Sequence, residues 1–318
     1  MALNVIRFQH DQRAQWGVIR QGRITPVPGH FSSTADFLRG TSFAALAALD
    51  APQLAESAVR LLSPITRDRQ FVCQGANYRQ HMIESGMDPD AKSFNMIFTK
   101  ASSCIVAADS EVVRPSFVKF LDYEIELGLV LRTDLTAATR VTDESLHETI
   151  AGLVIVNDYS ARDVQIPQSQ FYKGKSYRTF GPVGPYLCLL EPQDFAYLRK
   201  LQLTLTVNGE VRQNDDTGNL VHRPAATLTE LSGVQDLFAG DLIATGTPAG
   251  CALSIPPPSK QRIAALLSAR KRWDLFMKAQ SRRPQYLQPG DVVEARIRSA
   301  DGAIDLGVQR NRVVSAAA

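Results

Sequence analysis

The sequence predicts an α+β fold rich in β-strands, with a small N-terminal α/β domain at 1–65 and a second domain at 66–318. Three observations lead to this fold class. Apolar residues at helical spacing fill much of the N-terminal stretch, short β-rich segments separated by turn residues dominate from about residue 70 onward, and 44% of the 318 residues are hydrophobic. A chain of this size and composition can bury a core without disulfide bonds.

The N-terminal domain is expected to begin with strands and to continue with helices. Three segments rich in β-forming residues come first, at 5–8, 16–20 and 24–27. From Thr34 to Leu62 the apolar residues then recur at intervals of three and four. That spacing, in an Ala-rich composition, predicts helices broken near Gly40 and Pro52.

The second domain is expected to be built mainly from strands. Nine β-rich segments lie at 71–78, 96–100, 111–115, 123–131, 152–158, 184–190, 201–209, 241–250 and 291–297. The segment 201–209 alternates apolar and polar residues and ends in Asn208-Gly209, which predicts a half-buried strand of a hairpin. Residues 260–280 instead show helical spacing, so we expect an inserted helix within 252–286 that forms a lid or an interface.

Charge and cysteine content exclude several classes of protein. Lys and Arg number 35 against 32 Asp and Glu, and the charges are interspersed, which argues against a nucleic-acid or membrane partner.

No apolar stretch suits a signal peptide or a membrane span, so we expect a cytoplasmic protein. The cysteines, which contain no CxxC pair, are interpreted as small buried apolar residues: Cys73, Cys104, Cys188 and Cys251.

Three acidic residues are candidates for a metal site. In a strand, Glu124 and Glu126 would point to the same face about 7 Å apart, and such close like charges need a cation or protons between them. Asp158 ends the apolar strand at 152–158, where a rigid support can present a functional side chain. Three oxygen ligands suit a hard ion such as Mg²⁺ or Mn²⁺. The alternatives are a solvent-facing strand edge for the glutamates and a turn or capping role for Asp158.

Other residues could perform acid–base or electrostatic roles. His81 precedes Glu84 by three residues, so on a helix the carboxylate could orient the imidazole as a general base, although a surface pair is the simpler interpretation. Lys173 and Lys175 in KGKS could pair with a substrate carboxylate or a developing enolate. Thr247 lies in the Gly-rich GTPAG segment, which could approach an anion or form a plain turn.

Several of these segments, taken together and in order, resemble the fumarylacetoacetate hydrolase family. They are GANYRQH, MIFTKASSC, DYEIELGLVL, NDYSARDVQ, GKS, GPVGPYL, VNGEVRQ, GDLIATGTPAG and PGDVVEARI. The resemblance extends from about Phe71 to Val313. The first 65 or so residues also look like the small leading domain of many bacterial members.

The resemblance implies a mixed β-sandwich roll, usually homodimeric, that holds Mg²⁺, Mn²⁺ or Ca²⁺. The implied residues are Glu124, Glu126 and Asp158 as metal ligands, His81 and Glu84 as the dyad that positions water, Lys175 as the family lysine, and Gln165 and Thr247 as substrate contacts. Cys73-Gln74-Gly75 stands where the animal enzyme has a further acidic ligand, so the chain looks like the bacterial acylpyruvase or 2-hydroxyhepta-2,4-diene-1,7-dioate isomerase members. The stretch from Cys251 to Gln288 is also longer than in most members.

On this basis we expect a metal-dependent hydrolase that cleaves a carbon–carbon bond in a 1,3-diketo acid of the acylpyruvate or fumarylpyruvate type, through an enolate stabilised by the metal. The alternative is decarboxylation or isomerisation of a 2-oxo acid, such as oxaloacetate or an unsaturated dioate, at the same site. A third hypothesis is a catalytically silent binding protein that contacts its partner through the helix at 260–280.

Overall fold

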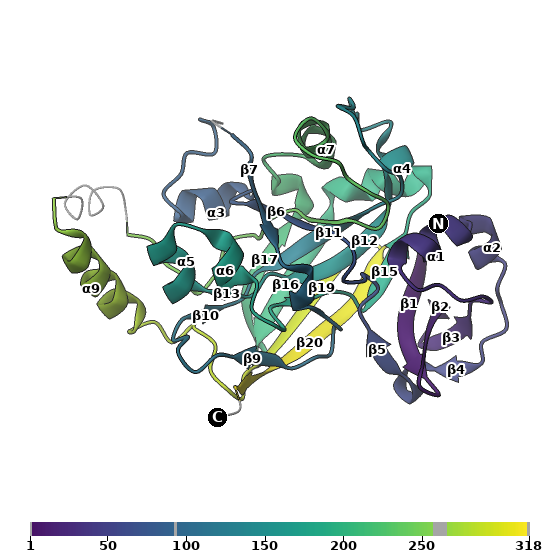
Figure 1. Cartoon of the computed structure of the whole chain (residues 1–318), viewed down its shortest axis with the longest axis horizontal. Helices are drawn as coiled ribbons and strands as arrows, with labels where there is room; N and C mark the ends of the chain where they lie inside the picture. Colours follow the sequence, from purple (N-terminus) through teal and green to yellow (C-terminus); the bar gives the residue numbers. More distant parts are fainter. Residues whose placement is uncertain (1, 92–93, 257–265, 317–318) are drawn as a thin grey trace.

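Two mixed sheets form the body of the protein in a computed structural model that describes residues 2–91, 94–256 and 266–316 (Figure 1). The larger sheet has the order β4 (Leu54–Ala55), β3 (Arg23–Pro26), β2 (Arg13–Arg20), β1 (Leu3–His10), β15 (Tyr186–Leu189), β12 (Ile150–Asn157), β11 (Ile125–Leu131), β18 (Leu242–Ala244), β6 (Phe71–Gly75) and β7 (Met96–Lys100), with β5 (Arg60–Leu62) beside β1. The predicted β-rich α+β class is therefore confirmed.

The second sheet packs against the middle of the first. Its order is β17 (Glu210–Asp216), β16 (Leu201–Val207), β19 (Val292–Ser299), β20 (Asp305–Ser315) and β9 (Val112–Arg114). Both sheets are mixed, because β18 runs parallel to β6 and β20 parallel to β9. Two short ladders complete the strands: β10 (Leu121–Asp122) with β13 (Ser160–Ala161), and β8 (Ile105–Val106) with β14 (Gly181–Pro182).

The core lies on both faces of the central strands β11 and β12, every residue of which is buried. One face of β11, with Leu127 and Leu129, shares a cluster with Leu205 of the second sheet. The other face, with Val130, belongs to a cluster that includes Phe37 of the N-terminal segment. Burial on both faces explains why the sequences of these two strands are nearly continuous runs of apolar residues.

All nine strand segments predicted for the second domain contain observed strands. The predicted hairpin is also present, since β16 and β17 pair antiparallel around Asn208-Gly209, both of which have positive φ. The sequence analysis missed β20, the longest strand, because its polar residues interrupt the apolar run.

The N-terminal segment is only partly helical, which corrects the prediction for Thr34 to Leu62. The helices α1 (Thr34–Gly40) and α2 (Phe43–Ala47) begin after serine N-caps, but the chain then forms β4, η1 (Glu56–Ala58) and β5. The reason is tertiary: β4 pairs with β3 and β5 with β1, and such pairing overrides a weak helical preference. Because β1 also pairs with β15, this segment extends the larger sheet, and the boundary at residue 65 stays a prediction.

The remaining helices are short apart from one. They are α3 (Arg79–Glu84), α4 (Leu146–Thr149), α5 (Arg162–Gln168), α6 (Phe171–Lys175) and α7 (Pro224–Ser232), with 3-10 turns η2 (Ser102–Cys104), η3 (Pro192–Arg199) and η4 (Thr217–Asn219). None of the helices in the described ranges is long and apolar enough to cross a membrane.

The inserted helix α9 (Ala269–Gln280) lies at the end of the molecule opposite the N-terminal strands (Figure 1). Of the predicted helix at 260–280, residues 260–265 lie outside the described residues, and the observed helix begins at Ala269. It begins there because the Ser268 side chain accepts a hydrogen bond from the Lys271 amide. The Phe276 ring packs edge-on against Phe120, 6.4 Å between centroids, which ties α9 to the body.

Candidate active site

The three candidate acidic residues converge at the ends of two central strands of the larger sheet. β11 and β12 are antiparallel with Ile125 opposite Asn157, so the start of one strand meets the end of the other. The Asp158 amide donates to the Glu124 carbonyl at 2.8 Å, which fixes the two backbones together. Carboxylate oxygens of Glu124, Glu126 and Asp158 lie within 4.8 Å of one another, and this trio is called the carboxylate centre below.

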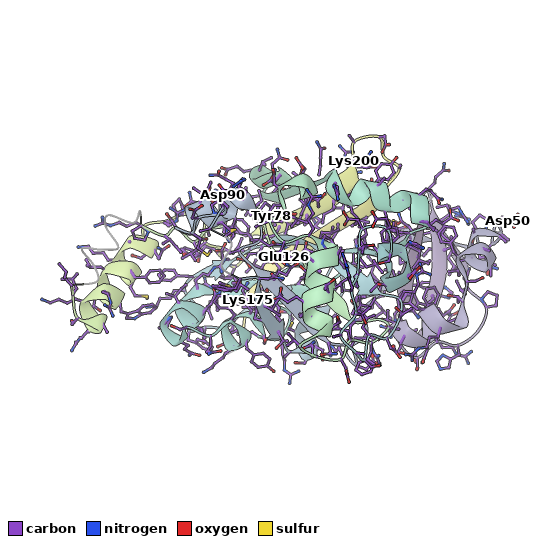
Figure 2. The ribbon with its side chains drawn as sticks, turned by 90° about the horizontal axis from the view of Figure 1, so that it is seen from above. Asp50, Tyr78, Asp90, Glu126, Lys175 and Lys200 are labelled. Carbon is purple, nitrogen blue, oxygen red and sulfur yellow. The ribbon has the colours of Figure 1, made fainter. Side chains whose placement is uncertain are left out.

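The local backbone differs from the regular strand expected through Glu124 and Glu126. The chain leaves β10 at Asp122 and enters β11 only at Ile125, and the Glu124 amide in between donates to the Asn157 side chain at 3.0 Å. Glu124 and Glu126 are 4% and 1% exposed, which rules out a solvent-facing edge. Figure 2 shows Glu126 and Lys175 in the interior, between α9 and the N-terminal strands.

Three buried cations neutralise much of this negative charge. Lys175 donates to Glu124, Asp158 and the Ser160 hydroxyl at 2.5, 2.5 and 2.9 Å. Lys100 donates to the other Asp158 oxygen at 2.5 Å and to a backbone carbonyl. Lys173, the other lysine of KGKS, is exposed.

Arg162 is the third cation. Its Nε donates to Asp122 at 2.8 Å and its Nη2 donates to Glu124. The sequence analysis missed Lys100, Arg162 and Asp122. The available signal was position, since Lys100 ends the apolar segment 96–100 and Arg162 follows Asp158 by four residues in NDYSARD.

The two glutamates differ in charge state. Burial alone would raise the pKa of Glu124, but Arg162 and Lys175 beside it hold that pKa far below its usual range. Burial, reinforced by Asp158 and Glu124, raises the pKa of Glu126 well above its usual range. Glu126 accepts a hydrogen bond from the Gly246 amide at 2.9 Å, whereas Lys175 donates to Glu124 and Asp158.

The carboxylate centre fits a hard divalent cation. All three ligand residues offer oxygen, which Mg²⁺, Mn²⁺ and Ca²⁺ prefer. A divalent ion would also favour ionisation of Glu126, whose carboxylate form is otherwise disfavoured by its surroundings. The donor set alone does not select one of these ions.

A cavity of about 190 Å³ opens onto the carboxylate centre. The predicted residues that line it are Glu124, Glu126, His81, Lys175, Gln165 and Thr247. Its remaining walls are largely apolar and include Met96, Phe98 and Phe171. The α9 helix supplies no lining residue among those described, although Leu253 and Ile255 at the start of the insertion do.

His81 and Glu84 lie on α3 but face different surroundings. His81 lines the cavity, and its Nδ1 is buried without a hydrogen-bond partner among the described residues. Burial lowers the pKa of His81, so the imidazole is neutral at pH 7. Glu84 is exposed and accepts a hydrogen bond from the Gly250 amide at 3.3 Å. Among the described residues no hydrogen bond or ion pair joins Glu84 to His81, but the nearby Glu84 carboxylate partly opposes the lowering of the His81 pKa by burial.

The two predicted substrate contacts are held by neighbouring side chains. Arg162 donates to the Gln165 carbonyl oxygen at 2.8 Å, which orients the amide. Gln213, a residue the sequence analysis did not single out, donates to the Thr247 hydroxyl at 2.9 Å, so the hydroxyl proton is left to donate elsewhere. Cys251 is buried, as predicted, and its Sγ lies 3.8 Å from Glu124.

Comparisons with known proteins agree with this fold. The family model described as fumarylacetoacetate (FAA) hydrolase C-terminal matches residues 70–314. An oxaloacetate tautomerase of Bacillus subtilis is 36% identical over 209 residues, which are 64% of this chain and 66% of that protein. A human mitochondrial oxaloacetate tautomerase is 35% identical over 209 residues, 65% of this chain and 64% of that protein. The match thus spans slightly less than two thirds of each relative.

Two solved structures extend the similarity to the whole chain. The fumarylacetoacetate hydrolase of Exiguobacterium antarcticum has a TM-score of 0.76 at 30% identity and covers 99% of this chain and 100% of that one. A probable 2-hydroxyhepta-2,4-diene-1,7-dioate isomerase of Mycobacterium abscessus has a TM-score of 0.74 at 27% identity and covers 100% of both chains. The N-terminal segment therefore has a structural counterpart in both proteins.

Proposed function

Because the chain belongs to the fumarylacetoacetate hydrolase family, we propose that it is an isomerase that moves a proton next to the carbonyl of a small 2-oxo acid, with oxaloacetate tautomerisation as the leading candidate. The names of the sequence relatives support this alternative over the carbon–carbon hydrolase that the sequence analysis favoured. Among the structural neighbours, one is named a hydrolase and another a probable dioate isomerase, so an isomerase activity also occurs among the names of proteins with this fold.

The observation that carries the proposal is a neutral, half-buried imidazole that shares a cavity with the carboxylate centre. Keto–enol interconversion requires a base that takes a proton from the carbon beside the carbonyl and returns a proton to carbon or oxygen. His81 can accept a proton through an unpartnered nitrogen. A divalent cation held by Glu124, Glu126 and Asp158 would supply positive charge next to the developing enolate oxygen.

Lys175 is assigned a positioning role in this proposal. Its ammonium has three protons, and Glu124, Asp158 and Ser160 accept them. Burial alone would lower the pKa of Lys175, but Asp158 and Glu124 raise it, so the amine stays charged. The lysine therefore holds two metal-binding carboxylates in place and does not serve as the proton acceptor.

The size of the cavity favours a short substrate. About 190 Å³ lies below the roughly 300–1,000 Å³ typical of pockets for drug-sized ligands. A four-carbon oxo acid suits this volume better than a long acylpyruvate. Thr247 and Gln165 are positioned to hydrogen-bond a carboxylate or carbonyl oxygen of such a substrate.

The test is to follow the ultraviolet absorbance of enol-oxaloacetate as it converts to the keto form, with and without the protein and Mg²⁺. We expect the protein to accelerate the conversion and His81→Ala to remove most of the acceleration. Pyruvate formation, measured in the same samples, separates decarboxylation from tautomerisation. No acceleration at any Mg²⁺ or Mn²⁺ concentration, together with cleavage of an acylpyruvate, would reject the proposal in favour of hydrolysis.

Hydrolysis is kept as the second candidate because His81 and Glu84 lie on one short helix. If Glu84 orients a hydrolytic water, Glu84→Gln should reduce acylpyruvate cleavage strongly. The tautomerase needs no water, so the same variant should retain enol-oxaloacetate conversion. Incubation in H₂¹⁸O gives an independent measure, because hydrolysis places label in a carboxylate product.

A further inference from the structure

A second group of potential metal ligands lies beside the carboxylate centre. His81, Glu124 and Cys251 each offer one ligand atom, and these atoms lie within 4.8 Å of one another. The three residues come from α3, from the residue before β11, and from the segment after β18. No motif in the sequence predicts this group, because 43 residues separate His81 from Glu124 and 127 separate Glu124 from Cys251.

The chemistry of this group differs from that of the carboxylate centre. One nitrogen, one sulfur and one oxygen form a donor set that suits Zn²⁺ and other thiophilic ions, whereas three carboxylates suit a hard ion. Glu124 belongs to both groups. Its Oε2 accepts from Lys175, while its Oε1 is the atom 3.8 Å from the Cys251 sulfur.

A second observation points to a ligand at this position. The Nδ1 atom of His81 is buried and has no hydrogen-bond partner among the described residues, and buried polar atoms are normally satisfied. An imidazole nitrogen without a hydrogen-bond partner can bind a metal ion.

Both ligand residues can be reached from cavities. Leu253 and Ile255 line the 190 Å³ cavity that contains His81 and also a second cavity of about 590 Å³ that contains Cys251. The two cavities therefore lie on either side of one short segment. An ion in the second cavity could reach the thiol directly.

We propose that Zn²⁺ or a similar thiophilic ion binds to His81 and Cys251, with Glu124 as a third ligand, and that the bound ion inhibits the enzyme. Binding forms a metal–sulfur bond and releases the thiol proton to solvent. Arg162 also bonds to Glu124, so the histidine and the cysteine are the main anchors. The site is independent of the proposed reaction, whereas the inhibition rests on the role of His81 as the base.

The site is tested with Co²⁺ added to the 318-residue chain in excess Mg²⁺, which keeps the carboxylate centre loaded. We expect a near-ultraviolet charge-transfer band from thiolate to Co²⁺ in the wild type and loss of this band in Cys251→Ala. The matched control is Cys188→Ala, in which the altered cysteine is buried in β15, and this variant should retain the band. His81→Ala should weaken Co²⁺ binding by at least about tenfold.

Three results would overturn the site: no band in the wild type at saturating Co²⁺, an equal band in Cys251→Ala, or loss of the band in Cys73→Ala instead. Cys251→Ser provides a second variant of similar size if Cys251→Ala does not fold. Zn²⁺ inhibition is then measured relative to the uninhibited rate of each variant. A cobalt band without Zn²⁺ inhibition would keep the site and reject the role of His81, so the two failures are distinguishable.

Discussion

At the scale of single residues, the surroundings of Glu124 and Glu126 favour opposite charge states of the two carboxyl groups, although both residues line the same cavity. Glu124 is ionised and paired with Arg162 and Lys175, whereas the surroundings of Glu126 favour its neutral form. Replacement of each carboxyl by a neutral amide of similar shape should therefore affect stability differently.

In the presence of a chelator, we expect Glu126→Gln to change the free energy of unfolding by less than about 1 kcal/mol, because the amide resembles the favoured protonated carboxyl. Glu124→Gln should lower it by roughly 3–5 kcal/mol, because Arg162 and Lys175 lose a buried anionic partner. Urea denaturation of both variants measures the difference. Equal losses in the two variants would contradict the assigned charge states.

Lys100 provides a second residue-scale prediction. Its side chain is completely buried and is paired with Asp158, which is also completely buried. Lys100→Met should lower the free energy of unfolding by about 3–5 kcal/mol and weaken Mg²⁺ binding by roughly 10–100-fold, because Asp158 loses a partner that orients it. Lys173→Met is the matched control: that lysine is exposed, so both quantities should stay near the wild-type values. Denaturation and calorimetric Mg²⁺ titration measure the two effects.

These residues also mark the limit of what the sequence could predict about the site. The carboxylates and Lys175 stand in recognisable segments, so their chemistry could be inferred before the fold was known. Lys100 and Arg162 could not be inferred in the same way, because their partners lie 58 and 38 residues away and the contacts exist only once β7, β11 and β12 are assembled. The same is true of Cys251, whose neighbours decide whether its thiol is inert.

At the scale of secondary-structure elements, strands were easier to predict than helices. The β-segments are buried on one or both faces, so burial leaves a clear apolar pattern in the sequence. The residues after α2 have a helical pattern, but they form β4 and β5, which pair with β3 and β1 of the larger sheet. The start of α9 depends on a single capping serine, which periodicity does not detect.

The close packing of β11 leads to an element-scale prediction. A Cβ added at Gly128 would lie 2.6 Å from Val154 and 2.9 Å from Leu242, both on the neighbouring strands. Gly128→Ala should therefore lower the free energy of unfolding by about 1–3 kcal/mol through overpacking. Gly233→Ala, at the end of α7, is the control because the nearest atom to its added Cβ is 3.4 Å away and its φ is negative. A Gly128→Ala protein as stable as the control would show that the strands can move apart freely.

At the scale of the whole molecule, the order of the strands was the main unknown. The sequence indicates which segments are strands, but pairing such as β1 with β15 joins residues that are 180 or more positions apart. That pairing makes the N-terminal segment continuous with the sheet that carries the carboxylate centre. A homodimer stays a prediction.

The last prediction concerns the stability of the whole molecule when the carboxylate centre binds a metal. An ion that binds only the folded state adds about 2.7 kcal/mol at a concentration 100 times its Kd, and each kcal/mol corresponds to roughly 2–4 °C in a large domain. We therefore expect saturating Mg²⁺ to raise the melting temperature by roughly 5 °C or more, and a chelator to reverse the rise. Glu126→Gln should remove the rise because the ligand is lost, while His81→Ala should retain it because this residue lies outside the carboxylate centre. Thermal scans at fixed protein concentration provide the measurement, and an undiminished rise in Glu126→Gln would place the Mg²⁺ site elsewhere.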